Sequence, residues 1–207
     1  ASACDYYNYT EDRDTFCELY PVIKKQMDAM YNTLDVDGIV TVMDGCDAFI
    51  DWCKGLEKIT SLHGVYLYVL NMLVGVLEKI QHNDKNIYLK RYQTALKSAE
   101  NILYDKEKQM FLNVKDNYQY SVHSTVWMVL GGVVDGEKAK KILLDSLNSN
   151  DSMKPLTPYM YHYVIEALFK LNLVKEATEY LKKYWGGMIE LGADTFYEAY
   201  VPNDLDF

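Results

Sequence analysis

The stretch SLHGVYLYVLNMLVGVLEKIQ, residues 61–81, says most about how this chain folds. It predicts a helix with aliphatic and aromatic side chains on nearly every face, and such a helix must be covered on both sides. The next stretch, residues 84–103, has one apolar face and one face rich in Lys and Glu, which is typical of an outer helix. Together the two stretches predict an inner helix paired with an outer helix.

The same succession of an apolar and an amphipathic stretch occurs twice more. Residues 122–133 are apolar and 137–147 amphipathic, and then residues 158–171 are aromatic and apolar and 175–184 amphipathic. Three pairs at a spacing of roughly forty residues, without a heptad seam, favour an α/α toroid or solenoid over a coiled coil. We therefore expect an all-α fold of helical hairpins, each with an inner and an outer helix. We see no convincing pattern of a β-sheet.

The regions around these pairs are less regular. A helix is expected over residues 15–33, capped by Asp12 or Asp14, and Pro21 marks either the first turn of a later start or a kink. Residues 39–58 predict an irregular excursion, and residues 104–120 a turn with a possible short hairpin. In a toroid we expect the long loops to leave the inner helices at one end and build a cleft there.

Composition limits the classes of partner. The 207 residues fit one domain, residues 1–207, or a piece of a larger repeating architecture. The net charge of −9 argues against nucleic acid and against an anionic membrane surface, and favours a neutral substrate. Nineteen tyrosines against six phenylalanines fit a protein lined by wet aromatic surfaces, although most should simply lie at the edge of the core.

The cysteines and the apolar runs make further predictions. The spacing of the four cysteines suits neither zinc nor a redox motif, so we expect buried free thiols, with a Cys46–Cys53 pair left open. We find no apolar run of membrane-spanning length and no signal peptide before residue 1. No phosphate loop, nucleophile elbow or metal triad is present, so neither a cofactor nor a metal is expected. The compartment stays open between the cytoplasm and the periplasm.

Near the C-terminus, residues 184–198 read YWGGMIELGADTFYE. We expect the glycine pair to end a helix, and a short run to place the Glu198 carboxylate among Phe196, Tyr197 and Tyr200. Rings around a carboxylate can raise its pKa by desolvation, which suits acid/base chemistry, and rings can also stack on a sugar. From physics alone, a helix cap leading into a packed aromatic turn is favoured.

Six motifs, taken in order, carry a resemblance to a known family. They are DYY at 5–7, YTED at 9–12, FIDW at 49–52, PYMYHY at 158–163, YWGG at 184–187 and GADTFYE at 192–198. In their order and spacing the chain resembles the C-terminal half of the catalytic domain of bacterial α-L-rhamnosidases, the six-hairpin glycosidases of family seventy-eight.

This resemblance implies that the fold is part of an (α/α)6 toroid of helical hairpins. It also implies a hydrolase that releases terminal α-L-rhamnose with inversion, using a general acid and a general base. Glu198 matches the base that activates water. The family's general acid lies in a segment before the start of this chain, and its last helix after Phe207. The resemblance therefore implies a fragment that is inactive alone, and that associates with itself through exposed inner-helix surface.

The resemblance also suggests residues that contact the sugar. Tyr197 stands where the family more often has tryptophan and keeps a stacking face, and Asp194 stands where threonine is common. Asp51 with Trp52 either presents a carboxylate and an indole to the sugar or anchors its loop. His162 is either a cleft residue or a satisfied core histidine.

The remaining histidines and tryptophans are weaker candidates for the site. His63 and His123 are weaker candidates than His162, and Trp127 and Trp185 are expected in the core. The alternative to an enzyme is a non-catalytic α/α repeat that binds protein or carbohydrate on its concave face.

Overall fold

The structure is a computed structural model of the chain, and it describes residues 1–43, 45–46 and 48–201. Within these residues the chain forms eight helices and four short strands. The helices are α1 (Ser2–Thr10), α2 (Arg13–Tyr31), α3 (Ile59–Lys79), α4 (Lys85–Ile102), α5 (Val122–Leu130), α6 (Gly136–Asn148), α7 (Pro158–Lys170) and α8 (Val174–Glu190). The strands are β1 (Tyr104–Asp105), β2 (Met110–Val114), β3 (Asn117–Ser121) and β4 (Ser152–Met153). The prediction of a mainly helical chain is confirmed.

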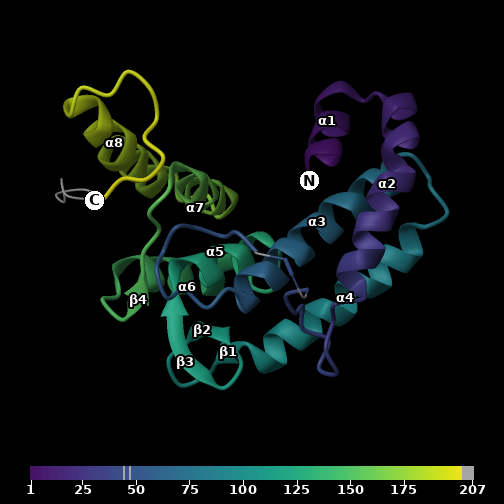
Figure 1. Cartoon of the computed structure of the whole chain (residues 1–207), viewed down its shortest axis with the longest axis horizontal. Coiled ribbons are helices and arrows are strands. Elements are labelled where there is room, and N and C mark those ends of the chain that lie inside the picture. The colour runs from purple at the N-terminus through teal and green to yellow at the C-terminus, as the bar shows by residue number, and fades with distance from the viewer. Residues whose placement is uncertain (44, 47, 202–207) are drawn as a thin grey trace.

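Helices α3, α5 and α7 form the covered layer of the molecule. Helix α5 contacts both of the others, and all nine of its residues are buried (Figure 1). At Gly64 of α3 an added Cβ would lie 2.6 Å from the Cβ of Trp127 and 2.7 Å from the Trp127 carbonyl carbon. The absence of a side chain at Gly64 is therefore what lets α3 and α5 approach so closely.

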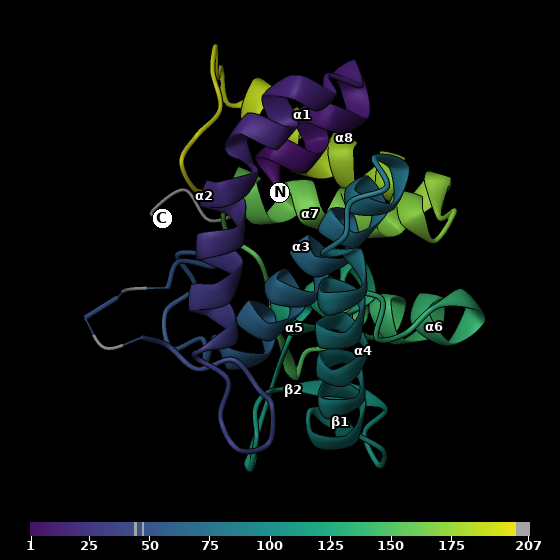
Figure 2. The same cartoon turned by 90° about the vertical axis from the view of Figure 1, so that its right-hand side faces the viewer.

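Each covered helix is followed by an outer helix that packs on it: α4 on α3, α6 on α5 and α8 on α7. These are the three predicted pairs. Helix α2 runs beside α4 (Figure 2), where the Asp28 carboxylate lies 2.7 Å from Arg91 Nη1 and the Asp84 carboxylate lies 2.8 Å from Lys24 Nζ. The molecule thus has a covered layer and an outer layer of helices.

The connections between helices alternate between short and long. We expected the long loops to leave the inner helices, but in the structure they lead into the N-terminal ends of these helices. This arrangement brings the longer connections toward the N-terminal ends of α3, α5 and α7. The short connections, from a covered to an outer helix, are residues 80–84, 131–135 and 171–173, and the long ones are 32–58, 103–121 and 149–157.

The N-terminal region holds one helix that the sequence did not predict. Helix α1 ends at Glu11, which has a left-handed φ of 55°. The predicted cap of the next helix is Asp12, whose carboxylate accepts a hydrogen bond of 3.0 Å from the Thr15 N–H. Helix α2 then continues on both sides of Pro21, so this proline lies in a helix interior and not in a first turn.

A small sheet corrects the expectation that no sheet forms. The predicted hairpin is present as β2 and β3, paired antiparallel, with β1 beside β2 and β4 parallel to β3. Two of its strands have only two residues each, which is too short for an alternating pattern to appear in the sequence. Residues 39–58 form neither a helix nor a named strand in their described part, as predicted.

Helix α8 runs past the two glycines that were expected to end it. Gly186 and Gly187 lie inside the helix, which continues to Glu190. It is terminated by Gly192, which has φ 84° and donates to the Ile189 carbonyl, while the Ala193 N–H donates to the Met188 carbonyl. This is the paired hydrogen bonding of a glycine-terminated helix, in which glycine readily adopts the left-handed conformation.

Two further expectations concern apolar length and thiols. Helix α3, with 21 residues, is long and apolar enough to cross a membrane, contrary to our expectation. It packs against α1, α4 and α5, and a core helix of this kind passes the same test. All four cysteines are free thiols, and Cys17 and Cys46 are exposed instead of buried.

Candidate functional site

The candidate site lies where several connections meet the N-terminal end of α7. In Figure 1 the connection 32–58, the link from β4 to α7 and the segment after α8 come together on the same side of the molecule. Hydrogen bonds join all three, because the Leu156 N–H donates to Asp51 and the Leu156 carbonyl accepts from the Tyr200 N–H. The segments that carry Asp51 and Glu198 therefore meet at one residue.

The Asp51 carboxylate is buried, and both of its oxygens accept hydrogen bonds from groups of the protein. Its Oδ2 lies 2.7 Å from His123 Nε2 and 2.8 Å from the Leu156 nitrogen. Its Oδ1 accepts from the Thr157 N–H at 3.1 Å and from the Trp52 N–H at 2.9 Å. Asp51 is only 4% exposed. This is the geometry of a loop anchor, one of the two roles that the sequence left open.

The charge of Asp51 follows from this environment. Burial by itself raises the pKa of the carboxyl group, but the hydrogen bond and the charge of His123 and the donors at Leu156 and Thr157 outweigh it. The net effect is that the pKa of Asp51 is lowered. The side chain is thus a carboxylate at neutral pH, able to accept from every donor around it.

His123 is completely buried in the first turn of α5, and its Nδ1 has no hydrogen-bond partner among the described residues. A proton on Nε2 supplies the hydrogen bond to Asp51, because the carboxylate oxygen can only accept.

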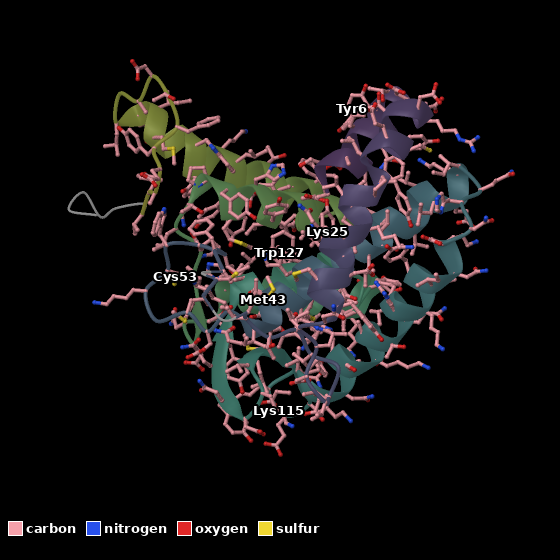
Figure 3. All side chains as sticks on the ribbon, turned by 45° about the vertical axis from the view of Figure 1, so that its right-hand side comes forward. Tyr6, Lys25, Met43, Cys53, Lys115 and Trp127 are labelled. Carbon is pink, nitrogen blue, oxygen red and sulfur yellow. The ribbon has the colours of Figure 1, made fainter. Side chains whose placement is uncertain are left out.

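Trp52 belongs to a row of aromatic rings that runs from the surface into the covered layer. The Trp52 indole is 57% exposed and lies 5.3 Å from the ring of Phe49. Beyond Phe49 the row continues through three further rings to Tyr68, with centroid distances of 5.9, 5.2, 4.2 and 5.9 Å. These three rings are Tyr159, Tyr163 and Trp127. Figure 3 labels Trp127 near the middle of the molecule.

His162 lies on α7 with its side chain 68% exposed, so it is not a core histidine. Its Nε2 is 3.9 Å from Glu166 Oε2, and Glu166 Oε1 accepts a 2.8 Å hydrogen bond from the Tyr68 hydroxyl. Burial first, and then this carboxylate, raise the pKa of Tyr68, so its hydroxyl remains a donor. An exposed imidazole and a half-buried carboxylate thus lie next to the aromatic row.

The segment after α8 carries the remaining candidates. We expected rings to enclose Glu198, but Glu198 is exposed and Phe196 is 73% exposed. Tyr197 is half-buried, and its ring lies 6.4 Å from that of Tyr200. Glu198 is therefore open to solvent on a segment held by the tyrosine that follows it.

Asp194 is exposed and lies apart from this tyrosine contact. With Thr195 and Phe196 it lines a pocket of about 410 Å³, whose other wall includes Trp185 and Met188 of α8. The structure therefore joins Asp51, Trp52 and the Tyr197–Glu198 segment to the N-terminal end of α7, and it puts Asp194 on the α8 side.

Two residues of the site had little signal in the sequence. His123 is only a weak candidate from the sequence, yet its Nε2 forms a hydrogen bond with the buried Asp51 carboxylate. Tyr200 was noted as a ring near Glu198, whereas its N–H fixes the segment to Leu156 at 3.0 Å. The signal for His123 was a histidine at the start of an otherwise apolar helix, which suggests a buried polar contact. Its partner Asp51 lies 72 positions away in the sequence. Trp127 is in the core as predicted, and Trp185 is partly buried.

His63, another weak candidate, is a satisfied core histidine. Its Nδ1 accepts from the Val40 N–H at 3.2 Å, and its Nε2 lies 3.0 Å from the Ala95 carbonyl oxygen. It therefore ties the connection 32–58 to α3 and α4.

Among the residues that the structure describes, no group of three or more His, Cys, Asp and Glu side chains could hold a metal ion.

Comparison with solved structures identifies similar proteins. The structure of a rhamnosidase from Klebsiella oxytoca with rhamnose bound superposes with a TM-score of 0.89 at 30% sequence identity. The match covers 99% of this chain and 40% of that one. A GH78 family rhamnosidase of Bacillus sp. GL1 superposes with a TM-score of 0.84 at 19% identity, over 99% of this chain and 22% of that one. The chain thus spans less than half the length of either relative.

Two other comparisons found no relative. No protein-family model matches the chain, and no curated protein matches it. The resemblance to the rhamnosidases of family seventy-eight, expected from six short motifs, is nevertheless confirmed by structures that match nearly the whole chain.

Proposed function

We propose that this chain, a relative of the family seventy-eight rhamnosidases, is part of the catalytic domain of a glycoside hydrolase that releases terminal α-L-rhamnose. The observation that carries the proposal is the match to a rhamnosidase with rhamnose bound, at 30% identity over 99% of the chain. A fold alone does not determine a reaction, so the proposal also depends on the residues at the N-terminal end of α7.

The proposed architecture is an (α/α)6 toroid of which this chain supplies one part. The three covered and outer helix pairs support it, as do the long connections that lead into the covered helices. In such a toroid these connections border the cleft, and the candidate site lies among them.

Glu198 is the proposed general base of an inverting mechanism. Its carboxylate is exposed and therefore accessible to a water molecule, and Tyr197 beside it offers a ring to the sugar. An inverting pair needs its two carboxyl groups about 6.5–9.5 Å apart, so that water fits between the base and the sugar ring. We propose that the general acid belongs to a part of the protein outside these 207 residues.

The proposed sugar contacts are the exposed side chains around the site. The indole of Trp52 offers a face for stacking, and the imidazole of His162 offers a hydrogen bond. Asp194 and Tyr197 complete the set from the segment after α8. No cofactor enters the proposed reaction.

The alternative, a non-catalytic repeat, predicts that the candidate residues are spread along an extended groove. Asp51 and the segment of Glu198 instead attach to the same residue, Leu156. This arrangement supports an enzyme site over a repeat surface.

The test is the substitution Glu198→Gln in the full-length protein, assayed with an aryl α-L-rhamnoside. Loss of a general base should lower kcat by about 100-fold or more, while the helical circular dichroism signal stays the same. The matched control is Glu190→Gln, an exposed glutamate in the last turn of α8, which should keep full activity. Unchanged turnover in Glu198→Gln would refute the assignment of the base.

We further propose that the isolated 207 residues are inactive, because a mechanism with two carboxyl groups does not operate with one. The same assay on the isolated chain tests this, and measurable hydrolysis would contradict it. Self-association of the isolated chain is proposed from exposed apolar side chains of the inner helix α7, Tyr159 and Phe169, and would appear as a dimer or larger species in sedimentation.

A further inference from the structure

We propose that Asp51 is a positioning residue: held by His123, it fixes the turn at Leu156–Thr157, which in turn holds the segment that carries Glu198. This inference rests on the proposed function of Glu198 as general base. It assigns Asp51 a role other than direct contact with sugar, and it gives His123 a role in the same site.

The first step is that the Asp51 carboxylate has no room for a ligand. Four donors occupy its two oxygens at distances between 2.7 and 3.1 Å, and the side chain is nearly fully buried. A sugar hydroxyl could bind only by displacing a backbone N–H or His123, which would leave a buried donor unpaired. Asp51 therefore acts on the neighbouring backbone.

The second step is that His123 attaches the Asp51 carboxylate to the hydrophobic core. Helix α5 is buried at every residue, so the imidazole in its first turn has a fixed position. Through the 2.7 Å hydrogen bond to His123, the loop that carries Asp51 takes its position from the covered layer of helices.

The third step is the peptide backbone of Leu156. Its N–H donates to Asp51, and its carbonyl oxygen accepts from the Tyr184 hydroxyl at 2.6 Å and from the Tyr200 N–H at 3.0 Å. Tyr200 follows Glu198 by two residues, and two residues span at most about 7 Å. A shift of Leu156 is therefore passed to the Glu198 backbone over a short length of chain.

The fourth step is a second attachment of Tyr200, to α8. An added Cβ at Gly187 would meet the Tyr200 hydroxyl and would lie 3.1 Å from Cζ of its ring. The Tyr200 ring also packs edge-on against that of Tyr184, with 5.4 Å between centroids. Gly187 thus provides the space in which the Tyr200 side chain lies, while Leu156 holds its backbone.

The main test is Asp51→Asn in the full-length enzyme. The amide keeps the size of the side chain but turns one acceptor into a donor that faces N–H groups. If Asp51 positions the base, kcat for the aryl rhamnoside falls by about 100-fold, the scale expected for a misplaced catalytic group, and KM changes less than about twofold. A rise in KM with kcat retained would instead make Asp51 a sugar ligand and overturn the proposal.

Hydrogen–deuterium exchange of the same variant separates positioning from general destabilisation. Peptides covering 154–160 and 194–201 should exchange faster in Asp51→Asn by a larger factor than peptides from α3, whose exchange reports the loss of global stability. Equal acceleration in all peptides, or unchanged protection of 194–201, would overturn the proposed link. Because exchange does not depend on Glu198 being the base, this result holds even if Glu198→Gln leaves kcat unchanged and the proposed function fails.

A matched pair of glycine variants tests the link from the other side, and applies if Asp51→Asn does not fold. Gly186→Ala meets no atom within 4 Å, whereas Gly187→Ala meets Tyr200. We expect Gly186→Ala to keep wild-type kcat and Gly187→Ala to lower it by about tenfold or more, with faster exchange in 194–201. Equal kcat in the two variants would overturn the proposal.

Discussion

Helix α5 and the segment 191–201 are at opposite extremes of burial in the same molecule. Every residue of α5 is buried, whereas no residue of 191–201 is. Close packing positions α5, through contacts such as that of Gly64 with Trp127, together with buried hydrogen bonds such as that of His123 with Asp51. The exposed segment has no buried residue to hold it in that way. It is held by the hydrogen bond from the Tyr200 N–H to the Leu156 carbonyl and by the packing of the Tyr200 ring on Tyr184, while the Leu156 N–H donates to the buried Asp51 carboxylate. An exposed carboxylate such as Glu198, the proposed base, thus depends on contacts made by the neighbouring residues of its segment.

The largest effect on stability is expected where the packing of the core is changed. Gly64→Ala puts a methyl group within 3 Å of Trp127, including its backbone, so α3 and α5 must separate. We expect a loss of about 3 kcal/mol in the free energy of unfolding, measured with urea. Gly75→Ala in the same helix meets no atom within 4 Å and should stabilise by up to about 1 kcal/mol. A similar loss of unfolding free energy in both variants would show that the close contact of Gly64 with Trp127 is not the cause.

A smaller, pH-dependent effect is expected at Asp51. Its pKa is lowered in the folded state, so the carboxylate stabilises the fold above about pH 4, and this contribution is lost as pH falls through the lower folded value. At pH 7, Asp51→Asn should cost about 1.5–3 kcal/mol, the usual value for hydrogen bonds to a charged group. The difference between wild type and variant, measured by urea unfolding, should shrink below about pH 4. A difference that stays constant down to pH 3 would show that the charge is not involved.

The smallest effect on stability is expected at His63, which also anchors the connection 32–58. Its contribution changes in a higher pH range than that of Asp51. Burial lowers its pKa, outweighing the Ala95 carbonyl and the charge of Asp35, which raise it. The ring is therefore neutral when folded and takes up a proton when unfolded, so stability falls as pH drops below about 6.5. The slope from this single group is at most about 1.4 kcal/mol per pH unit. In His63→Gln it should be absent between pH 7 and 5, and an unchanged slope would contradict the assignment.

The helix pairs could be predicted because their signal is local. Residues 61–81 have an apolar pattern on all faces, and α3 is found within two residues of the expected bounds. The end of α8 was missed because glycine is compatible with a helix interior when packing supports it. At Gly187 that support comes from Tyr200, 13 positions later, and no local pattern reveals such a contact.

The candidate residues show the same division. Their chemical types, their order and the resemblance to rhamnosidases were present in the sequence, and so was Glu198 as the candidate base. The two roles of Asp51 could not be distinguished from the sequence, because His123 and Leu156 lie 72 and 105 positions away. The choice depends on which donors the fold brings to the carboxylate.

By itself, the sequence determined the three pairs of a covered and an outer helix, since periodicity and hydrophobicity act within a few turns of chain. Only the tertiary structure decided which connections meet at α7 and which groups fill the Asp51 carboxylate. It also decided that Glu198 is exposed. These outcomes depend on directed contacts between distant parts of the chain, and each contact needs a distance and an angle that no neighbouring residue specifies.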